Sequence, residues 1–523
     1  MIKKSILIYC GLFLGLSTMT IAQESPTWQK YVKQKSLKQE TELPDFSYAG
    51  YHRGEKAIQD ADYKVFDVTK YGAKPDDKRS DRKAVQKAIR AAEKNGSGII
   101  FFPPGEYRLQ EKKDPTTPIK IRGNKIVLRG SGSHEGGTKI YFAKDLPPLD
   151  PNKLWTCPYF IEFSARGKDT YISNIANDLK RGDKTVELAR TEGLKKDQWV
   201  FINLSNKDPE LIKHEMCGCK VDKKWKSITE KKGIYIKEYH QIKEINGNKV
   251  TFYEPVMHRV EAKHNWKLYT FACSSEVGVE DIAFVGNWHE NFVHHKNAFH
   301  DGGYSGVKLG RTVNSYMRRC SFKDFNRIAH VSGSANISVV NCVITGTPGH
   351  SSIGSSASSR VFLGKIDDQS SQWHAPGVAG PAIGTVIWRV RYTDKTSFES
   401  HASQPRATLF DCVEGGFFLG RAGGARQNLP NHMEDLILWN FKETDTADKD
   451  FEFWSSKTWF WKLLPPTIVG FHGAGTTFKS SQVKIDESHG TPVKPESLYE
   501  SQLKLRLGEL PEWLVELKKI EFQ

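Results

Sequence analysis

The sequence contains few long apolar stretches. After residue 22, no apolar run approaches the roughly 18 residues that a membrane-spanning helix requires. Tripeptide and heptad repeats are also absent, and aromatic residues make up 11% of the 523 positions. These features exclude a collagen, a coiled coil and a disordered chain. The sequence therefore predicts a folded, aromatic-rich protein with no membrane span.

Cysteine is scarce, and its spacing fits neither crosslinks nor zinc. Of the 8 cysteines, Cys10 lies near the N-terminus and the others follow residue 22. The odd number that follows residue 22 cannot pair completely, so a scaffold held by disulfides is not predicted. Cys217 and Cys219 are separated by one residue, whereas structural zinc sites use longer spacers and a second pair of ligands.

Acidic residues are outnumbered by basic ones. Lys and Arg total 76 against 61 Asp and Glu, which gives a formal net charge of +15. A basic surface attracts anions, so we expect an anionic partner. The basic residues are dispersed along the chain instead of forming tracts, which argues against nucleic acid as that partner. The composition leaves the oligomeric state open.

The first 22 residues have the pattern of a signal peptide. Lys3 and Lys4 form a basic start, and an apolar segment runs from Ser5 to Leu16. Small residues follow, up to Ala22. We expect cleavage near Ala22/Gln23 and a mature chain that is secreted or periplasmic.

The first region of predicted order combines a strand, a helix and a second strand. Phe66-Asp-Val-Thr-Lys-Tyr-Gly-Ala is followed by a helix with one apolar stripe, and then by Gly98-Ile-Ile-Phe-Phe-Pro-Pro-Gly-Glu-Tyr. This combination resembles the opening of the pectate-lyase superfamily. The resemblance implies an N-terminal capping helix and the first turn of a right-handed parallel β-helix.

A 22-residue period in the middle of the chain supports the same fold independently. Leu309, Val331 and Ile353 are each 22 residues apart, and so are Cys320 and Cys342. Apolar positions in register at such a period are typical of stacked solenoid coils. The predicted fold class is all-β, a right-handed parallel β-helix with coils of about 22 residues.

The predicted organisation has four parts. Residues 1–22 form the signal peptide, 23–60 a polar N-terminal leader, 61–488 the β-helix and 489–523 a helical cap on the last coil. Within the β-helix we expect a β-rich insertion at about 173–262, and long loops over one face. Caps of this kind shield the open sheet edges of a solenoid.

Basic side chains gather where the coils are best defined. If Leu309 and Val331 face inward, Lys308 and His330 face outward on consecutive strands, because side chains alternate along a strand. Small residues beside them leave room for a sugar. The candidate catalytic residues are Lys308, Arg311, Arg327, His330, His350 and Tyr304.

A histidine-rich loop precedes these strands. It runs from Trp288 to Tyr304 and has the length and composition of a substrate-binding wall. The candidate substrate-binding residues on it are Trp288, His294, His295, Lys296 and His300. A metal held by His294, His295 and His300 is left open, because no motif fixes its geometry.

The candidate residues are suited to β-elimination from a uronic acid. That reaction needs a base for the proton beside the carboxylate, a cation for the carboxylate and an acid for the departing oxygen. Histidine, lysine, arginine and tyrosine supply these roles, and arginine can clamp a carboxylate through two parallel hydrogen bonds. Many β-helix polysaccharide lyases, which this chain resembles in fold, use basic residues in this way, often with calcium. The resemblance leaves Ca²⁺ open as a cofactor.

As a whole, the chain is similar to exported enzymes of marine Bacteroidetes that degrade ulvan-like algal polysaccharides. Some of that group are dehydratases, which expel water from a terminal uronate by the same elimination. The resemblance implies a secreted carbon–oxygen lyase that acts on an anionic, sulfated and uronate-containing glycan. It would act as a polysaccharide lyase or as an oligosaccharide dehydratase.

Two alternatives stay open. The stretch Gly349-His350-Ser351-Ser352-Ile353-Gly354-Ser355 is similar to a motif of polygalacturonase-type glycoside hydrolases, which are also β-helices. Inverting hydrolysis needs two carboxylates, and this chain has Phe325-Asn326-Arg327 where those hydrolases carry an Asp pair. Asp324, Asp367 or Asp368 could substitute from a loop. The second alternative is a carbohydrate-binding solenoid without catalysis.

Overall fold

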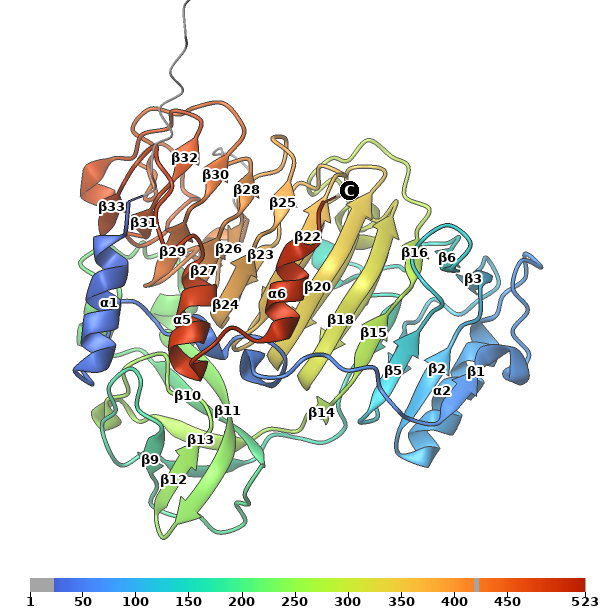
Figure 1. Ribbon diagram of the computed structural model, residues 1–523, viewed down its shortest axis with the longest axis horizontal. Helices are drawn as coiled ribbons and strands as arrows, with labels where there is room; N and C mark the ends of the chain where they lie inside the picture. The colour runs from blue at the N-terminus through green and yellow to red at the C-terminus, as the bar shows by residue number, and fades with distance from the viewer. Residues whose placement is uncertain (1–22, 418–422, 523) are drawn as a thin grey trace, which may run out of the picture.

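The chain winds into a parallel β-helix (Figure 1). The computed structural model describes residues 23–417 and 423–522, so the predicted signal peptide lies outside the described residues. Within these ranges, no helix is both long enough and apolar enough to cross a membrane. The predicted all-β parallel β-helix is confirmed by two large parallel sheets that the successive coils share.

A seven-stranded parallel sheet forms one face of the β-helix. Its strands, in spatial order, are β4 (Ile119–Ile121), β7 (Ile161–Phe163), β17 (Ser305–Gly310), β19 (Arg327–Ser332), β21 (Ser351–Ser356), β23 (Gly377–Ala379) and β26 (Ser400–His401). Neighbouring strands come from successive coils, so each residue lies beside its counterpart in the next coil, at about 4.8 Å.

A twenty-stranded sheet forms the rest of the coil wall. Its strands are β1 (Val65–Asp67), β2 (Gly98–Phe101), β3 (Gly105–Gln110), β5 (Ile126–Arg129), β6 (Thr138–Phe142), β14 (Ser274–Ser275), β15 (Gly278–Glu280), β16 (Ala283–Val285), β18 (Thr312–Lys323), β20 (Ala335–Thr345), β22 (Phe362–Asp368), β24 (Ile383–Trp388), β25 (Arg391–Tyr392), β27 (Arg406–Asp411), β28 (Glu414–Gly415), β29 (Leu436–Trp439), β30 (Lys442–Glu443), β31 (Thr467–Val469), β32 (His472–Gly473) and β33 (Ile485–Glu487). The long strands turn a corner at residues with positive φ, among them Arg319, Asn341 and Lys365.

The register confirms the 22-residue period for one step and corrects it for the next. Lys308 pairs with His330, and Cys320 pairs with Cys342. His330 then pairs with Gly354, so the following coil contains 24 residues. The cause is the turn before β21, which spans 346–350, whereas the turn before β19 spans only 324–326. Ile353 therefore lies beside Ala329, and the expected pairing of Ile353 with Val331 is wrong.

A capping helix covers the first coil, as the sequence predicts. Helix α2 (Arg82–Asn95) buries an apolar stripe that includes Val85, Ala88 and Ala92. Strand β2 approaches the helix closely, since a Cβ added to Gly98 would lie 2.8 Å from the Cβ of Ala92. Inside the coils, aromatic side chains such as Phe284 and Phe322 stack across neighbouring strands at 5.1 Å between ring centroids.

An antiparallel sheet interrupts the β-helix and projects from one side of it (Figure 1). Its strands, in spatial order, are β8 (Tyr171–Asn174), β13 (Lys267–Thr270), β10 (Trp199–Asn206), β11 (Ile234–Asn246), β12 (Lys249–Phe252) and β9 (Thr185–Glu187). Helix α3 (Pro209–Glu215) belongs to the same segment. The insertion has its own apolar core, built around Trp225 and Trp266.

The first and the last of the described helices lie against the β-helix. Helices α5 (Leu498–Leu507) and α6 (Glu512–Lys519) lie on the outer face of the large sheet (Figure 1), where Tyr499 packs on Phe362. The sequence predicts that this C-terminal segment caps the last coil. The helices instead pack against the outward-facing Trp388 and Trp439 of the large sheet. Helix α1 (Pro26–Ser36) reaches the last coil, where the Thr27 amide donates to Glu487 at 3.0 Å.

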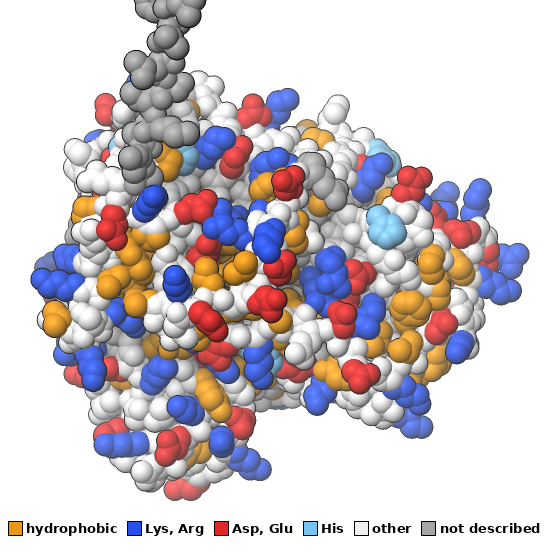
Figure 2. All heavy atoms as spheres, viewed as in Figure 1, with side chains coloured by type: hydrophobic (Ala, Val, Ile, Leu, Met, Phe, Trp, Pro, Cys, Tyr) orange, Lys and Arg blue, Asp and Glu red, His pale blue; other side chains and the backbone are white. Residues whose placement is uncertain are grey.

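Charged side chains are spread over the outer surface. On the face seen in Figure 2, Lys and Arg side chains lie among Asp and Glu side chains over the large sheet and the insertion. Although the chain has a net charge of +15, basic and acidic side chains are interspersed on this face.

Candidate active site

A cavity of about 530 Å³ lies over the seven-stranded sheet. Its floor is formed by strands β17, β19, β21 and β23, and one wall by the segment before β7. The polar or aromatic side chains that line it include Trp155, Tyr159, Glu162, Lys308, Arg327, His330, Ser332, His350, Ser356, His374, Glu399 and His401. Four consecutive coils thus supply a row of groups suited to binding and proton transfer.

The centre of the floor is a column of residues in register. Glu162, Lys308, His330 and Gly354 lie side by side on four neighbouring strands. Lys308 makes no hydrogen bond or ion pair with any residue of the described ranges. Burial lowers the pKa of Lys308, and Glu162 partly opposes that effect. The ammonium group is available to bind an incoming anion.

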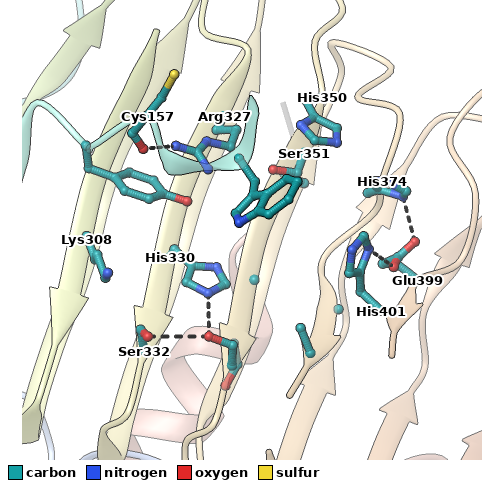
Figure 3. Close-up of a pocket in the computed structure, with 18 of the residues that line it drawn as sticks. Cys157, Lys308, Arg327, His330, Ser332, His350, Ser351, His374, Glu399 and His401 are labelled. Atoms are coloured by element: carbon teal, nitrogen blue, oxygen red, sulfur yellow. Dashed lines mark hydrogen bonds and ion pairs between the residues drawn. The ribbon is translucent and has the colours of Figure 1, made fainter. Parts of the chain in front are cut away.

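His330 is held as a neutral imidazole. Burial, together with the nearby charges of Lys308 and Arg327, lowers the pKa of His330 to about 3. Its Nε2 lies 2.7 Å from Ser356 Oγ (Figure 3), and that hydroxyl donates onward to Ser332 Oγ at 3.4 Å. In the tautomer in which Nε2–H donates to Ser356 Oγ, the lone pair lies on Nδ1. Such a nitrogen can accept a proton from a substrate.

Glycine at position 354 keeps His330 Nδ1 accessible. A Cβ built on Gly354 would lie 3.2 Å from this nitrogen. Because Gly354 is the residue paired with His330, any larger side chain would cover the lone pair.

Arg327 and Tyr159 form the next part of the wall. The Arg327 guanidinium lies 4.8 Å from the centroid of the Tyr159 ring and donates to Ser305 Oγ at 2.7 Å. It also donates to the carbonyl of Cys157 (Figure 3). Burial raises the pKa of Tyr159, so its phenol stays protonated at neutral pH and can act as a proton donor.

Histidines and one glutamate form the far end of the cavity. Glu399 Oε2 lies 2.6 Å from His374 Nδ1, and Glu399 Oε1 lies 3.0 Å from His401 Nδ1 (Figure 3). Burial opposes the ionisation of Glu399, yet the two histidines lower its pKa to about 2. The two histidines therefore favour the carboxylate form of Glu399, which is not the form that donates a proton as a general acid.

Four of the six predicted catalytic residues line the cavity. These are Lys308, Arg327, His330 and His350. Arg311 does not line it, because its guanidinium is held by both Asp169 oxygens and by the Ala272 carbonyl near the insertion. The assignment of Arg311 to the catalytic set is therefore corrected to a structural one.

Tyr304, also predicted to be catalytic, does not line the cavity. Its side chain is 4% exposed and lies in the apolar core, with its hydroxyl donating to the Ala143 carbonyl at 3.1 Å. Strand β17 begins one residue later, so the ring turns inward beneath the sheet that carries Lys308.

The histidine-rich loop contributes differently from what its composition suggests. Trp288 is fully buried and donates to the Pro348 carbonyl at 2.8 Å, so it presents no ring to a sugar. His300 is buried and accepts from the Val293 amide at 3.2 Å. Lys296 is exposed outside the cavity lining. The prediction that these three residues bind substrate is therefore corrected. Trp288 and His300 are buried, and Lys296 does not line the cavity.

The two other loop histidines lie beside the cavity end. His294 is in ring contact with His350 and with His374, at centroid distances of 5.3 and 5.6 Å. His295 Nδ1 lies 2.8 Å from Asp301 Oδ2, and this hydrogen bond raises the pKa of His295. The metal-binding combination of His294, His295 and His300 is not assembled, since His300 points into the core.

Several cavity residues were missed by the sequence reasoning. They are Trp155, Tyr159, Glu162, His374, Glu399 and His401. Tyr159-Phe-Ile-Glu-Phe163 alternates as a strand does, which would have placed Glu162 on the outside with Lys308. His374 and His401 lie at or near strands of three and two residues, too short to carry a periodic signal.

Calcium does not fit this cavity. Ca²⁺ takes six to eight oxygen ligands. Among the described residues that line the cavity, the carboxylates are Glu162 and Glu399, and Glu399 is already engaged by two histidines. The donor set at the far end is rich in nitrogen instead.

Two protein families match parts of the chain. Residues 65–144 match the family described as rhamnogalacturonase A/epimerase, pectate lyase-like. Residues 371–517 match a domain of unknown function, DUF4955. The first match covers the capping helix and the opening coils, where the sequence resembles the pectate-lyase superfamily. The second begins beside His374 and includes Glu399 and His401 of the cavity.

Curated relatives share a short segment with this chain. Alginate lyase 7 of Azotobacter vinelandii is 35% identical over 75 residues, which is 14% of this chain and 9% of the relative. Mannuronan C5-epimerase AlgE6 of the same organism is 38% identical over 75 residues, again 14% of this chain and 9% of the relative. The chain thus spans about a tenth of the length of these relatives.

Solved structures with a similar course of the chain have low sequence identity. The A-module of mannuronan C-5 epimerase AlgE4 from Azotobacter vinelandii has a TM-score of 0.32 and 12% identity, over 81% of this chain and 92% of that one. An exopolygalacturonase from Thermotoga maritima has a TM-score of 0.32 and 11% identity, over 85% and 92%.

Proposed function

We propose that this protein is a carbohydrate-active carbon–oxygen lyase that acts on uronic acid residues by β-elimination. The observation that carries the proposal is the column in which neutral His330 lies beside the free ammonium group of Lys308, with Arg327 and Tyr159 adjoining. Together they place a base, two cations and an acid around one cavity. β-Elimination requires these three kinds of group.

Each group has a role in the proposed reaction. Lys308 and Arg327 bind the uronate carboxylate and stabilise the negative charge that develops there. His330 Nδ1 accepts the proton from C5, the carbon beside that carboxylate. Tyr159 returns a proton to the departing oxygen at C4. The C5–H electron pair becomes the C4=C5 double bond, and the C4–O bond breaks with its electron pair on the oxygen.

The rim of the cavity supports a glycan as the substrate. Trp155 is 66% exposed and Leu149 is 74% exposed, and both line the cavity opening. A flat indole in water is suited to packing against the apolar face of a sugar ring. We propose that Trp155 binds the residue next to the one that reacts.

The carboxylates of the site support elimination over hydrolysis. Asp324, Asp367 and Asp368, the candidates for a hydrolytic pair, do not line the cavity. Asp367 is paired with Arg391, and Asp324 accepts from the Thr347 amide at 2.9 Å. Of the two carboxylates that line the cavity, Glu162 and Glu399, the second is held in its ionised form by two histidines and is unsuited to be the acid that glycoside hydrolysis uses.

The proposed substrate is an anionic polysaccharide or oligosaccharide that contains uronic acid, with an ulvan-like sulfated algal glycan as the first candidate. The net charge of +15 and the cationic cavity floor favour such a partner. The segmental relatives named as an alginate lyase and a mannuronan C5-epimerase are consistent with chemistry at a uronate. We also propose that the mature chain works after export, following removal of residues 1–22.

Mass spectrometry of products tests the proposal. The mature protein is incubated with ulvan, pectate, alginate and their oligosaccharides. Unsaturated fragments whose masses sum to the parent mass indicate a lyase, and loss of one water at unchanged length indicates a dehydratase. Gain of one water per cleavage would contradict elimination and favour the hydrolase alternative. Binding without any change in mass or in sugar configuration would favour the non-catalytic solenoid.

A further inference from the structure

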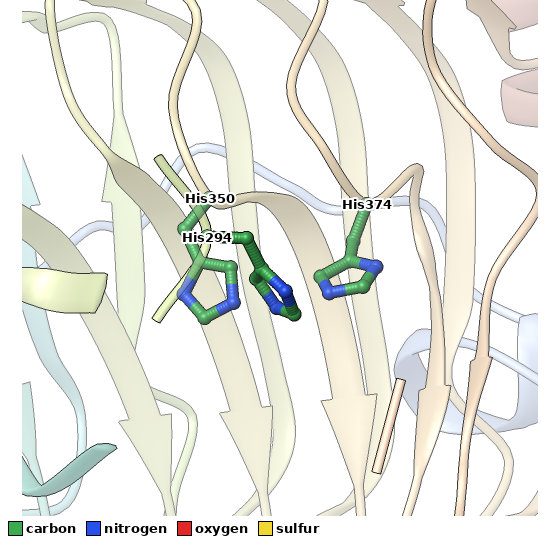
Figure 4. A group of neighbouring side chains, drawn as sticks. All are labelled: His294, His350 and His374. Atoms are coloured by element: carbon green, nitrogen blue, oxygen red, sulfur yellow. The ribbon is translucent and has the colours of Figure 1, made fainter. Parts of the chain in front are cut away.

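We infer that His294, His350 and His374 form a binding site for a divalent transition-metal ion such as Zn²⁺. One ring nitrogen from each residue lies within 4.8 Å of those of the other two. The three rings converge from the histidine-rich loop and from two successive coils (Figure 4). Imidazole nitrogen is a preferred ligand of zinc, copper, nickel and iron, and not of calcium or magnesium.

The nitrogen atoms that would bind the metal lack other partners. His294 Nε2, His350 Nε2 and His374 Nε2 are all buried and make no hydrogen bond. A buried polar atom without a partner destabilises the fold, so a cluster of three such atoms points to a bound ligand. A single metal ion would satisfy all three nitrogens together.

The opposite edges of two of these rings are held as metal-binding histidines commonly are. His350 Nδ1 donates to the Asp301 carbonyl at 2.7 Å, and His374 Nδ1 lies 2.6 Å from Glu399 Oε2. Contacts of this kind fix the ring orientation and direct Nε2 toward a metal. His294 is instead positioned by stacking on Trp373, with ring centroids 5.1 Å apart.

The site adjoins the cavity but does not include its central column. His350 and His374 line the cavity end, whereas Lys308 and His330 lie on its floor. Zinc–imidazole bonds measure about 2.0–2.1 Å, so metal binding would draw the three rings closer together. Three protein ligands leave a further position for an oxygen ligand, such as a carboxylate or water from the cavity.

Metal binding by the mature protein tests the inference directly. The protein is treated with a chelator, dialysed and titrated with ZnCl₂ in a calorimeter, and its metal content is measured by mass spectrometry. We expect one equivalent of Zn²⁺ and a rise in the melting temperature. Absence of both binding and a thermal shift would overturn the proposed site. No substrate is present, so this result is independent of the proposed elimination.

Variants identify the ligands. His294→Ala and His374→Ala are expected to abolish Zn²⁺ binding, while His289→Ala, an exposed histidine of the same loop, keeps it. His374 is shared with a second possible group, formed with Glu399 and His401. Loss of Zn²⁺ in His401→Ala together with full binding in His294→Ala would contradict the three-histidine assignment.

Two further measurements do not depend on the folding of a ligand variant. The Co²⁺ form of the unmodified protein is expected to show visible absorption bands typical of imidazole ligands at low coordination number. A spectrum of hexa-aqua Co²⁺ would overturn the proposal. Glu399→Gln is expected to weaken Zn²⁺ binding about 10- to 100-fold, because it loosens the orientation of His374.

Discussion

At the scale of single residues, the proposed elimination depends on two paired neighbours, His330 as the base and Lys308 as a ligand of the carboxylate. His330→Ala removes the proposed base, and a positioned base contributes about 10²- to 10⁴-fold to a rate. We expect kcat to fall by that factor while the melting temperature stays close to that of the unmodified protein. Lys308→Ala should also abolish turnover, since it removes a carboxylate ligand. Near-normal activity of both variants on a substrate of the unmodified protein would exclude this column as the active site.

Trp155 provides a separate test at the same scale. Trp155→Ala removes an exposed ring from the cavity rim, and aromatic packing of this kind contributes about 1 kcal/mol. We expect KM to rise about fivefold with kcat nearly unchanged, measured by initial rates on oligosaccharides. Trp459→Ala is the matched control, because that indole is also exposed but does not line the cavity. An equal rise in KM for both variants would argue against a sugar subsite at Trp155.

At the scale of elements, the close approach of β21 to β19 controls access to His330. Gly354→Ala places a methyl group 3.2 Å from His330 Nδ1 without straining the backbone. We expect a clear loss of kcat with an unchanged fold, as measured by circular dichroism and initial rates. Gly475→Ala is the control, since its Cβ would meet nothing within 4 Å. Full activity of Gly354→Ala would contradict Nδ1 as the proton acceptor.

The strand pairings between coils could be predicted in part from the sequence. The pairs Lys308–His330 and Cys320–Cys342 could be predicted, because equal turns preserve the 22-residue period between long strands. The far end of the cavity could not, since the longer turn at 346–350 shifts the register and β26 has only two residues. The direction of Arg311 and Tyr304 depends on Asp169 and the core, which no local pattern reveals.

At the scale of the whole molecule, buried neutral histidines predict acid sensitivity. Burial lowers the pKa of His432 to about 4 and that of His330 to about 3, and it also lowers the pKa of His240. Below pH 6.5 these histidines take up protons in the unfolded chain but stay neutral in the folded chain. The free energy of unfolding therefore decreases as the pH is lowered. For fully buried His432 the loss is about 1.4 kcal/mol per pH unit between 6.5 and 4.

Thermal melts across this pH range measure the effect. We expect the melting temperature to fall steadily from pH 7 to pH 4, and His432→Gln to reduce the slope if the variant folds. A melting temperature that is constant or rises toward pH 4 would contradict neutral burial of these imidazoles.

The fate of the proton beside the carboxylate tests the central claim most directly. Oligosaccharides carrying deuterium at C5 of the uronate are incubated with the mature protein, and the products are weighed by mass spectrometry. We expect the unsaturated product to have lost one deuterium to solvent, that at C5 of the uronate that reacted, whereas unreacted uronates keep theirs. In His330→Ala we expect every deuterium to stay in place. Cleaved fragments whose deuterium atoms sum to the number in the parent oligosaccharide would contradict proton abstraction at C5, and with it the proposed elimination.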